Sequence, residues 1–218
     1  QIPMAQDITA EADSGGHTDN RPLVALLPSL LAMAGRFQAK HGYASKLRVG
    51  AAGGISTPGS AAAAFAMGAA YVLTGSVNQA CVESGSSDRV RDMLARSGQA
   101  DTAMAPAADM FEMGVKVQVL KRGTMFAMRA HKLYDLYRAY ASLEAVPADQ
   151  LGALERDLFR APVAEIWAQT RRFFMERAPA EAARGDKDPK HRMALVFRWY
   201  LGCASGWANS GDPSRQLD

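Results

Sequence analysis

The stretch DITAEADSGGHTDN (Asp7–Asn20) organises the chain. A short alternating apolar segment leads into Gly15–His17, where two glycines present a histidine. The same plan recurs in LRVGAAGGIST (Leu47–Thr57) and AAYVLTGSVN (Ala69–Asn78). Short β-type runs that each end in a glycine-rich or polar loop are typical of one side of a (β/α) barrel, whose site lies at the C-terminal ends of its strands.

Helices are expected between these strands. Pro22 marks the start of the first helix, with the Asn or Asp before it as the cap, and Gly42 provides the stop. Thr57 and the following proline open a second, alanine-rich helix. The order β-α-β-α-β predicts parallel pairing, whereas a doubly wound Rossmann sheet lacks its GxGxxG signature here. The strands are expected over residues 4–10, 47–52 and 70–73.

After Asn78 the pattern becomes mainly helical, with one alternating strand over residues 115–120 and a weakly patterned stretch over 101–114. The expected fold class is α/β: the C-terminal portion of a (β/α)8 TIM barrel over residues 1–85, followed by a mainly helical extension over 86–218. Because three strands cannot close a barrel, the chain is interpreted as a fragment of a longer one. Helices are expected over residues 87–97, 124–143, 148–159, 163–177 and 192–208.

Composition narrows the class of protein. The 218 residues are 48% hydrophobic, which suffices for a buried core, and no apolar run reaches the roughly 18 residues that span a bilayer. The net charge of +3 is small, and neither a nucleic-acid nor a membrane partner is expected. Cys81 and Cys203 are too few and too far apart for a disulfide framework or a metal site. We therefore expect a cytoplasmic protein without a metal.

The two later loops predict an anion site. Gly53 and Gly54 let the backbone approach a ligand, and the N–H groups of residues 54–56 are expected to point out of a helix N-terminus. Phosphate sites built by neighbouring βα loops recur in barrels of this kind. The alternative is a pair of glycine-containing turns without a ligand. The third loop, which adds N–H groups and two hydroxyls, is Thr74-Gly75-Ser76.

His17 is the candidate catalytic residue. The neighbouring glycines let its imidazole approach a flat ring system, and histidine gives or takes a proton near neutral pH. Three flanking carboxylates are placed to orient the ring. The alternative is a structural histidine that caps the following helix. The carboxylates are Glu11, Asp13 and Asp19.

These motifs carry a resemblance to a known family. EADSGGHTDN, followed by GAAGGIST and VLTGS, resembles the nitronate monooxygenase (2-nitropropane dioxygenase-like) family of FMN barrels. Within that family, ADSGGHTDNRP, TGSVNQACVESG and APAADMFEMGVKVQVLKRGTMFAMRA are similar to the trans-acting enoyl reductases of polyunsaturated fatty acid and trans-acyltransferase polyketide synthases. Ala10 and Asp13-Ser14 stand where nitronate monooxygenases usually carry Gln and Glu-Ala, which favours the enoyl reductase branch.

The resemblance implies an oxidoreductase with FMN and NADPH (or NADH) that reduces an α,β-unsaturated acyl thioester on an acyl carrier protein. It implies that His17 lies beside the flavin as the catalytic residue, with Gly15 near the isoalloxazine. Two alternatives stay open: nitronate monooxygenase activity on the same barrel, and a non-catalytic docking module of a synthase complex. The remaining implied cofactor-binding residues are Gly16, Gly53, Gly54, Thr74, Gly75 and Ser76.

A cluster of basic residues follows the predicted strand at 115–120. We expect it to be either an ordinary solvated surface or, as a hypothesis, a docking surface for the acidic carrier protein. The cluster comprises Lys116, Lys121, Arg122, Arg129 and Lys132.

Overall fold

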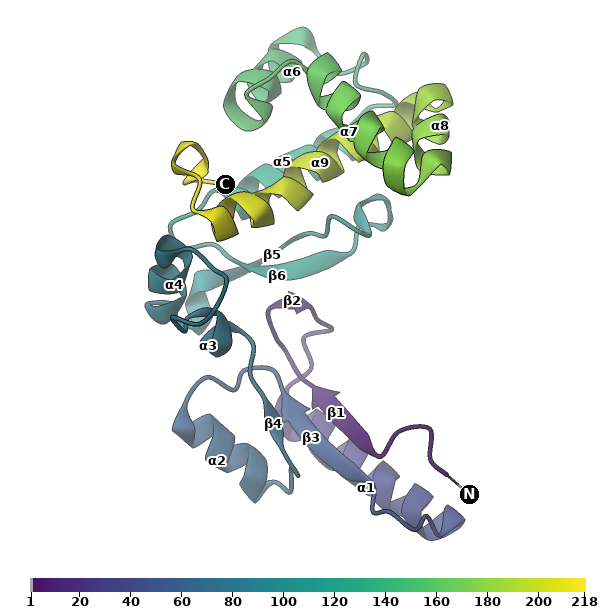
Figure 1. The fold of residues 1–218 in the computed structure, drawn as a ribbon, viewed down its shortest axis with the longest axis vertical. Helices are drawn as coiled ribbons and strands as arrows, with labels where there is room; N and C mark the ends of the chain where they lie inside the picture. Colours follow the sequence, from purple (N-terminus) through teal and green to yellow (C-terminus); the bar gives the residue numbers. More distant parts are fainter. Residues whose placement is uncertain (1) are drawn as a thin grey trace. The chain divides into compact units, whose positions relative to one another are not determined.

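The computed structural model describes residues 2–218, which form two compact units (Figure 1). The first, here called the sheet unit, runs to Gly85 and also includes Arg91–Arg96. The second, the helical unit, comprises Ser86–Val90 and Ser97–Asp218. The chain up to residue 96 contains β1 (Asp7–Glu11), β2 (Gly16–His17), α1 (Leu23–His41), β3 (Arg48–Ala52), α2 (Pro58–Ala66), β4 (Val72–Leu73), α3 (Ser76–Gln79) and α4 (Asp88–Ala95).

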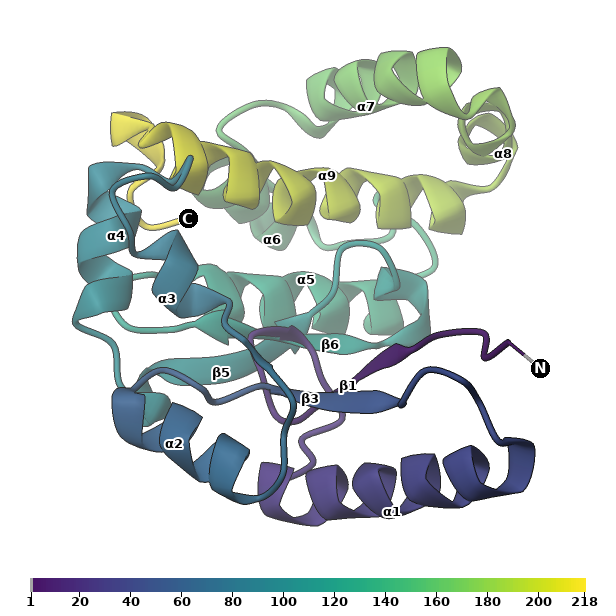
Figure 2. The same cartoon turned by 60° about the horizontal axis from the view of Figure 1, so that its bottom comes forward.

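The sheet unit is built on a parallel sheet of order β1-β3-β4. The predicted β-α-β-α-β order and parallel pairing are therefore confirmed. Ala10, Val49 and Ala51 are buried on one face of this sheet, where they pack with Leu27 of α1 and Ala64 of α2. Figure 2 shows both helices on the same side of the strands. This burial explains why the strands are rich in small apolar residues.

On the opposite face of the sheet, a hydrogen bond links Thr9 of β1 to Tyr71, which precedes β4. The Tyr71 hydroxyl lies 3.0 Å from Thr9 Oγ1, and a Cβ atom at Gly50 would overlap the Tyr71 ring. Thr9 and Gly50 are paired in the parallel register, so the aromatic ring lies against a strand position that has no room for a side chain. At the start of the same strands, Arg48 donates to both Asp7 carboxylate oxygens at 2.6 and 2.8 Å.

The helix ends confirm one predicted stop and one predicted N-cap, and correct another predicted N-cap. Gly42 has a φ of 57° and donates to Gln38 O, which ends α1 as expected. Thr57 caps α2 and accepts from Ser60 N–H, also as expected. The N-cap of α1, however, is Pro22 without a side-chain hydrogen bond, so the expected Asn or Asp cap is wrong. Asn20 lies two residues too early and donates its N–H to Thr18 instead.

The helical unit contains an antiparallel strand pair, β5 and β6, of which the sequence predicted only β6. β6 corresponds to the predicted strand at 115–120, but its antiparallel partner β5 falls in the stretch described as weakly patterned. α8 was also not expected. The fold class of α/β with a mainly helical C-terminal part is confirmed. The elements are η1 (Gln99–Asp101), β5 (Thr102–Pro106), η2 (Phe111–Met113), β6 (Lys116–Leu120), α5 (Phe126–Ala139), α6 (Ala148–Leu154), the π-helical η3 (Glu155–Phe159), α7 (Val163–Arg177), α8 (Pro179–Lys187), α9 (Pro189–Ser210) and η4 (Pro213–Arg215).

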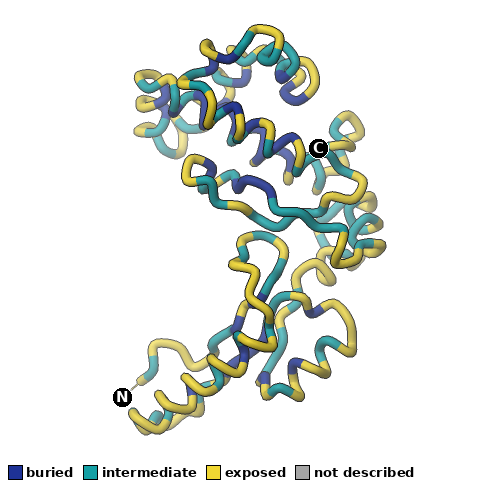
Figure 3. The backbone as a smooth tube through the Cα atoms, turned by 180° about the vertical axis from the view of Figure 1, so that it is seen from behind, coloured by how far each residue is buried: buried dark blue, intermediate teal, exposed yellow. Residues whose placement is uncertain are grey.

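α9 carries the core of the helical unit. Much of this helix is buried, from His191 to Ala204, as its dark segments in Figure 3 show. Phe197 meets Phe111 edge-on at 6.3 Å between ring centroids, which joins α9 to η2. Trp207, near the end of the helix, packs on Trp199 at 5.7 Å. Phe111 and Phe197 are fully buried, and burial of such large aromatic side chains contributes strongly to the stability of a core.

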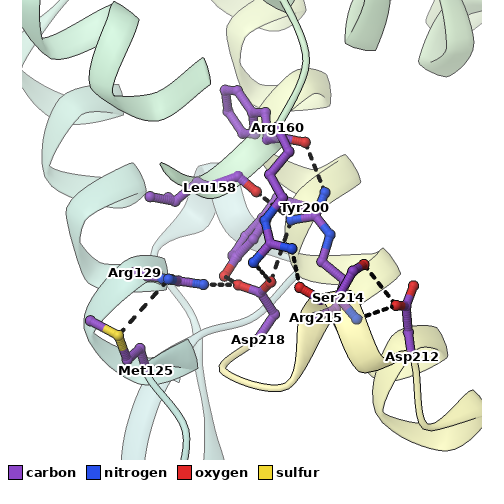
Figure 4. Close-up of polar contacts among 10 residues, drawn as sticks. Met125, Arg129, Leu158, Arg160, Tyr200, Asp212, Ser214, Arg215 and Asp218 are labelled. Atoms are coloured by element: carbon purple, nitrogen blue, oxygen red, sulfur yellow. Dashed lines mark hydrogen bonds and ion pairs between the residues drawn. The ribbon is translucent and has the colours of Figure 1, made fainter. Parts of the chain in front are cut away.

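A buried carboxylate holds the C-terminal segment of the chain (Figure 4). The Asp218 side chain has no exposed surface and accepts hydrogen bonds from Tyr200 OH at 2.6 Å and from the Arg129 guanidinium. Burial and the neighbouring carboxylate raise the pKa of Tyr200, so its hydroxyl stays protonated and remains a donor. Arg215 binds the same carboxylate and also donates to Leu158 O and Phe159 O at the end of η3. Arg129 is thus a buried residue whose guanidinium is paired with Asp218.

The contact of Tyr71 with Gly50 gives a prediction about stability. Gly50→Ala is expected to destabilise the sheet unit by about 1–3 kcal/mol, because the added methyl group overlaps a ring that is held by its bond to Thr9. Gly35→Ala, in α1, is the matched control, since a Cβ atom there meets nothing within 4 Å. It should stabilise by about 0.5–1 kcal/mol. Chemical denaturation followed by circular dichroism tests both; equal stabilities would contradict the steric account.

Candidate functional site

The C-terminal ends of three parallel strands bring their following loops to one edge of the sheet unit. Glu11 pairs with Ala52, and Ala52 pairs with Leu73, so β1, β3 and β4 end at the same level. Ala12 N–H continues the ladder with a 2.8 Å bond to Ala52 O. This edge is where parallel α/β sheets bind ligands. The three loops that leave it are residues 12–22, which include β2, residues 53–57, and residues 74–76, which lead into α3.

The first two loops touch through their backbones at Gly53. A Cβ atom at this position would lie 2.5 Å from Ala12 O and 2.8 Å from Asp13 O. The φ angle of Gly53 is 89° and that of Gly54 is 69°, which L side chains rarely adopt. Gly53 is therefore required for the two loops to meet. At Gly54 only the backbone conformation favours glycine, since a Cβ atom there would lie 4.0 Å from Asp13 O.

The first and third loops also meet. A Cβ atom at Gly15 would lie 3.8 Å from Ser76 Oγ, which is ordinary van der Waals distance. Both residues are exposed, as are Gly54 and Gly75. The structure thus brings the predicted glycines and Ser76 to one accessible edge.

Part of the expected set of N–H donors is used inside the second loop. Ser56 N–H donates to Ser60 Oγ at 3.2 Å, and Thr57 N–H donates to the same oxygen at 3.0 Å. The expectation that Ser56 N–H points at a ligand is therefore wrong, because the side chain of Ser60 captures it in the capping box of α2. Across residues 2–218, Gly54 N–H donates to no other group, so it is available to a ligand.

Thr74 is also engaged within its own loop. Its hydroxyl donates to Asn78 Oδ1 at 2.9 Å, and Asn78 Nδ2 returns a 2.9 Å bond to Thr74 O. Asn78, on the short helix α3, is a residue that the sequence reasoning missed, although it follows Thr74 by only four residues. Ser76 is consequently the hydroxyl of this loop that faces a neighbouring loop.

His17 lies in the two-residue strand β2, is exposed, and follows Gly16, whose φ is 87°. The loop around it is closed at its base, because Asp13 N–H donates to Arg21 O at 2.9 Å. Thr18, which the sequence reasoning also missed, lies inside this loop and bonds to Asp13. The flanking carboxylates have further partners: Glu11 accepts from Ser14 Oγ, and Asp19 lies 3.8 Å from Arg21 Nε.

The basic cluster of the helical unit is smaller than expected. Arg129 is only 9% exposed and bonded to Asp218, so its inclusion in an accessible surface is wrong. The other members are exposed, and Arg122 lies 3.4 Å from Asp101. Lys132 lines a surface groove of about 650 Å³ over α5. The groove is lined by Met128, His131, Lys132, Asp135, Leu136, Ala139, Tyr140 and Gln150.

A solved structure of an enoyl reductase domain matches almost the whole chain. The enoyl reductase domain of MlnA, from the macrolactin biosynthesis cluster of Bacillus amyloliquefaciens, is 41% identical and superposes with a TM-score of 0.89 over 99% of this chain. The chain is a homologue of this enoyl reductase domain. It spans 48% of the MlnA chain, so about half of that domain has no counterpart in these 218 residues.

Curated relatives also align with the whole chain. The chain is 50% identical to a polyunsaturated fatty acid synthase protein of Thraustochytrium sp. and 46% identical to polyketide biosynthesis protein PksE of Bacillus subtilis. It aligns over its full length in both cases but spans only 15% and 28% of those proteins. Residues 140–218 also match the family described as [acyl-carrier-protein] S-malonyltransferase, inserted helical domain. No helix within residues 2–218 is long and apolar enough to cross a membrane.

Proposed function

We propose that this chain is part of an FMN-dependent enoyl reductase. In this proposal the enzyme uses NADPH or NADH to reduce the α,β-unsaturated acyl thioester of an acyl carrier protein during polyketide or polyunsaturated fatty acid synthesis. The observation that carries the proposal is the match of nearly the whole chain to the MlnA enoyl reductase domain. We assign FMN binding to residues 1–85 and regard 86–218 as an extension of that portion.

The three-loop edge suits the phosphate of FMN. Gly53 admits no side chain, Gly54 offers an N–H group, and Ser76 offers an exposed hydroxyl beside Gly15. Backbone N–H groups and hydroxyls in glycine loops are common phosphate ligands. These residues therefore fit the group, whereas Thr74 contributes less directly because its hydroxyl is donated to Asn78. FMN, when bound, supplies the carrier through which a hydride from the nicotinamide reaches the substrate.

His17 is assigned the proton step. Reduction of the enoyl thioester adds a hydride to the β-carbon and a proton to the α-carbon, so an acid is needed near the α-carbon. An imidazole that holds a proton near neutral pH meets this requirement. The exposed position of His17 in its glycine loop leaves the ring accessible to a substrate.

The purified full-length protein tests the function. We expect it to be yellow, to bleach with NADPH under anaerobic conditions, and to be re-oxidised by a crotonyl thioester on a carrier protein. Oxidation of a nitronate with uptake of O2 and without NADPH would instead support a nitronate monooxygenase, because a nitronate donates electrons to a flavin and does not accept them. A colourless protein that binds synthase components would support a docking module.

The contact at Gly53 predicts the effect of a side chain on FMN retention. Gly53→Ala should lower the FMN content of the purified full-length protein at least tenfold, because the new Cβ atom forces apart the loops after β1 and β3. Gly59→Ala is the control, since its Cβ atom meets only Thr57 Oγ1, at 3.9 Å. Flavin absorbance per protein measures both. Equal FMN content in the two variants would remove Gly53 from the cofactor site.

His17→Ala is expected to keep FMN and the rate of bleaching by NADPH, but to slow enoyl reduction about 10²–10⁴-fold, the usual contribution of general acid catalysis. Stopped-flow measurement of the two half-reactions separates these effects. Unchanged re-oxidation by the enoyl thioester would return His17 to a structural role.

The proposed partner is an acidic acyl carrier protein, and the proposed location is the cytoplasm, where the free cysteines Cys81 and Cys203 would stay reduced.

Lys121→Glu with Arg122→Glu should raise KM for the carrier-bound substrate about tenfold and leave KM for a small thioester unchanged, because only the carrier protein carries the acidic surface. Lys40→Glu with Lys46→Glu reverses two exposed charges in the sheet unit as a control. Unchanged KM for carrier-bound substrate in the first variant would exclude the basic cluster as a docking surface.

A further inference from the structure

The loop that presents His17 is closed by its own backbone and side chains. Asp13 N–H donates to Arg21 O at 2.9 Å, so the two ends of the loop are joined across its base. Inside, Thr18 Oγ1 donates to Asp13 Oδ1 at 3.3 Å and accepts from Asn20 N–H at 3.1 Å. One hydroxyl thus links the start of the loop to its end.

The Thr18 hydroxyl has the chemistry for both bonds at once. A hydroxyl has one hydrogen to donate and two lone pairs to accept with. Because Asn20 N–H occupies a lone pair, the hydrogen is left for the Asp13 carboxylate, which is an acceptor. Asn20 has a φ of 58°, a left-handed conformation that asparagine adopts more readily than most residues other than glycine, and its N–H is held there by the bond to Thr18.

Asp13 connects this loop to the Gly53 loop, which follows the neighbouring strand β3. Its carbonyl oxygen lies 2.8 Å from the position that a Cβ atom of Gly53 would take. Its N–H closes the loop at Arg21, and its carboxylate receives Thr18. Thr18, which follows His17 in the sequence, is therefore bonded to Asp13, and Asp13 contacts the Gly53 loop that is predicted to bind phosphate.

We propose that Asp13 and Thr18 are positioning residues that hold the His17 loop in register with the Gly53 loop. This inference rests on the proposed role of His17. Neither residue is assigned contact with the reacting atoms; they act through the backbone on either side of the imidazole. A histidine on an unbraced loop with two glycines would sample many positions, and a displacement of about 1 Å can cost a reaction about 10²-fold.

The test compares Thr18→Val with Thr18→Ser in the full-length protein. Valine has nearly the shape of threonine but makes neither bond, whereas serine retains both. We expect Thr18→Val to slow re-oxidation of the NADPH-reduced protein by an enoyl thioester about tenfold, with FMN content and bleaching by NADPH unchanged. Serine should restore the rate to within about twofold of the natural protein.

A double variant separates positioning from general damage. If Thr18 acts through His17, Thr18→Val should add no further loss in a His17→Ala background, because the two effects are not independent. Additive losses, or a natural rate in Thr18→Val, would overturn the proposal.

Amide hydrogen exchange makes the test independent of activity. Residues 14–20 should exchange faster in Thr18→Val than in the natural protein and Thr18→Ser. If the natural protein does not reduce enoyl thioesters, the proposed function fails, and the exchange comparison still decides whether Thr18 braces the loop. Equal exchange in all three proteins would refute the brace.

Discussion

The candidate site depends on the lack of a side chain at residue 53. The carbonyl oxygens of Ala12 and Asp13 occupy the space that a Cβ atom would need, so the loops after β1 and β3 can touch only through glycine. This contact fixes Asp13, and Asp13 in turn fixes both ends of the loop that carries His17. The missing side chain at Gly53 therefore lets the loop after β3 contact Asp13, which bonds to Arg21 and Thr18 on the other side of His17.

The elements that the sequence predicted well are those whose signals are local. Gly42 and Thr57 mark helix ends by their own conformational preferences, and the apolar strands identify the buried sheet. β5 was missed because its identity depends on pairing with β6, which lies outside any local window. α8 was missed because Ala182 and Gly185 are its buried residues, with Gly185 against the Trp167 ring, so the helix shows no large apolar stripe.

The same distinction applies to the candidate site. Glycine pairs are visible in a sequence because the residue type itself implies an unusual backbone. The bonds of Thr18 to Asp13 and of Ser60 to Ser56 are not visible, because many polar residues near a loop could pair with one another. Arg129 shows the opposite error. It was predicted to be exposed because it lies among exposed lysines, but its buried partner Asp218 lies 89 residues further along the chain.

The aromatic core of the helical unit has a practical consequence for studying the two units separately. All three tryptophans of the chain, Trp167, Trp199 and Trp207, belong to the helical unit, whereas the sheet unit contains only tyrosine and phenylalanine. Tryptophan fluorescence, excited at the long-wavelength edge of the aromatic absorption band where tyrosine absorbs little, therefore reports the environment of the helical unit alone. Loss of that signal, compared with loss of total secondary structure, would show whether the two units melt together or in sequence.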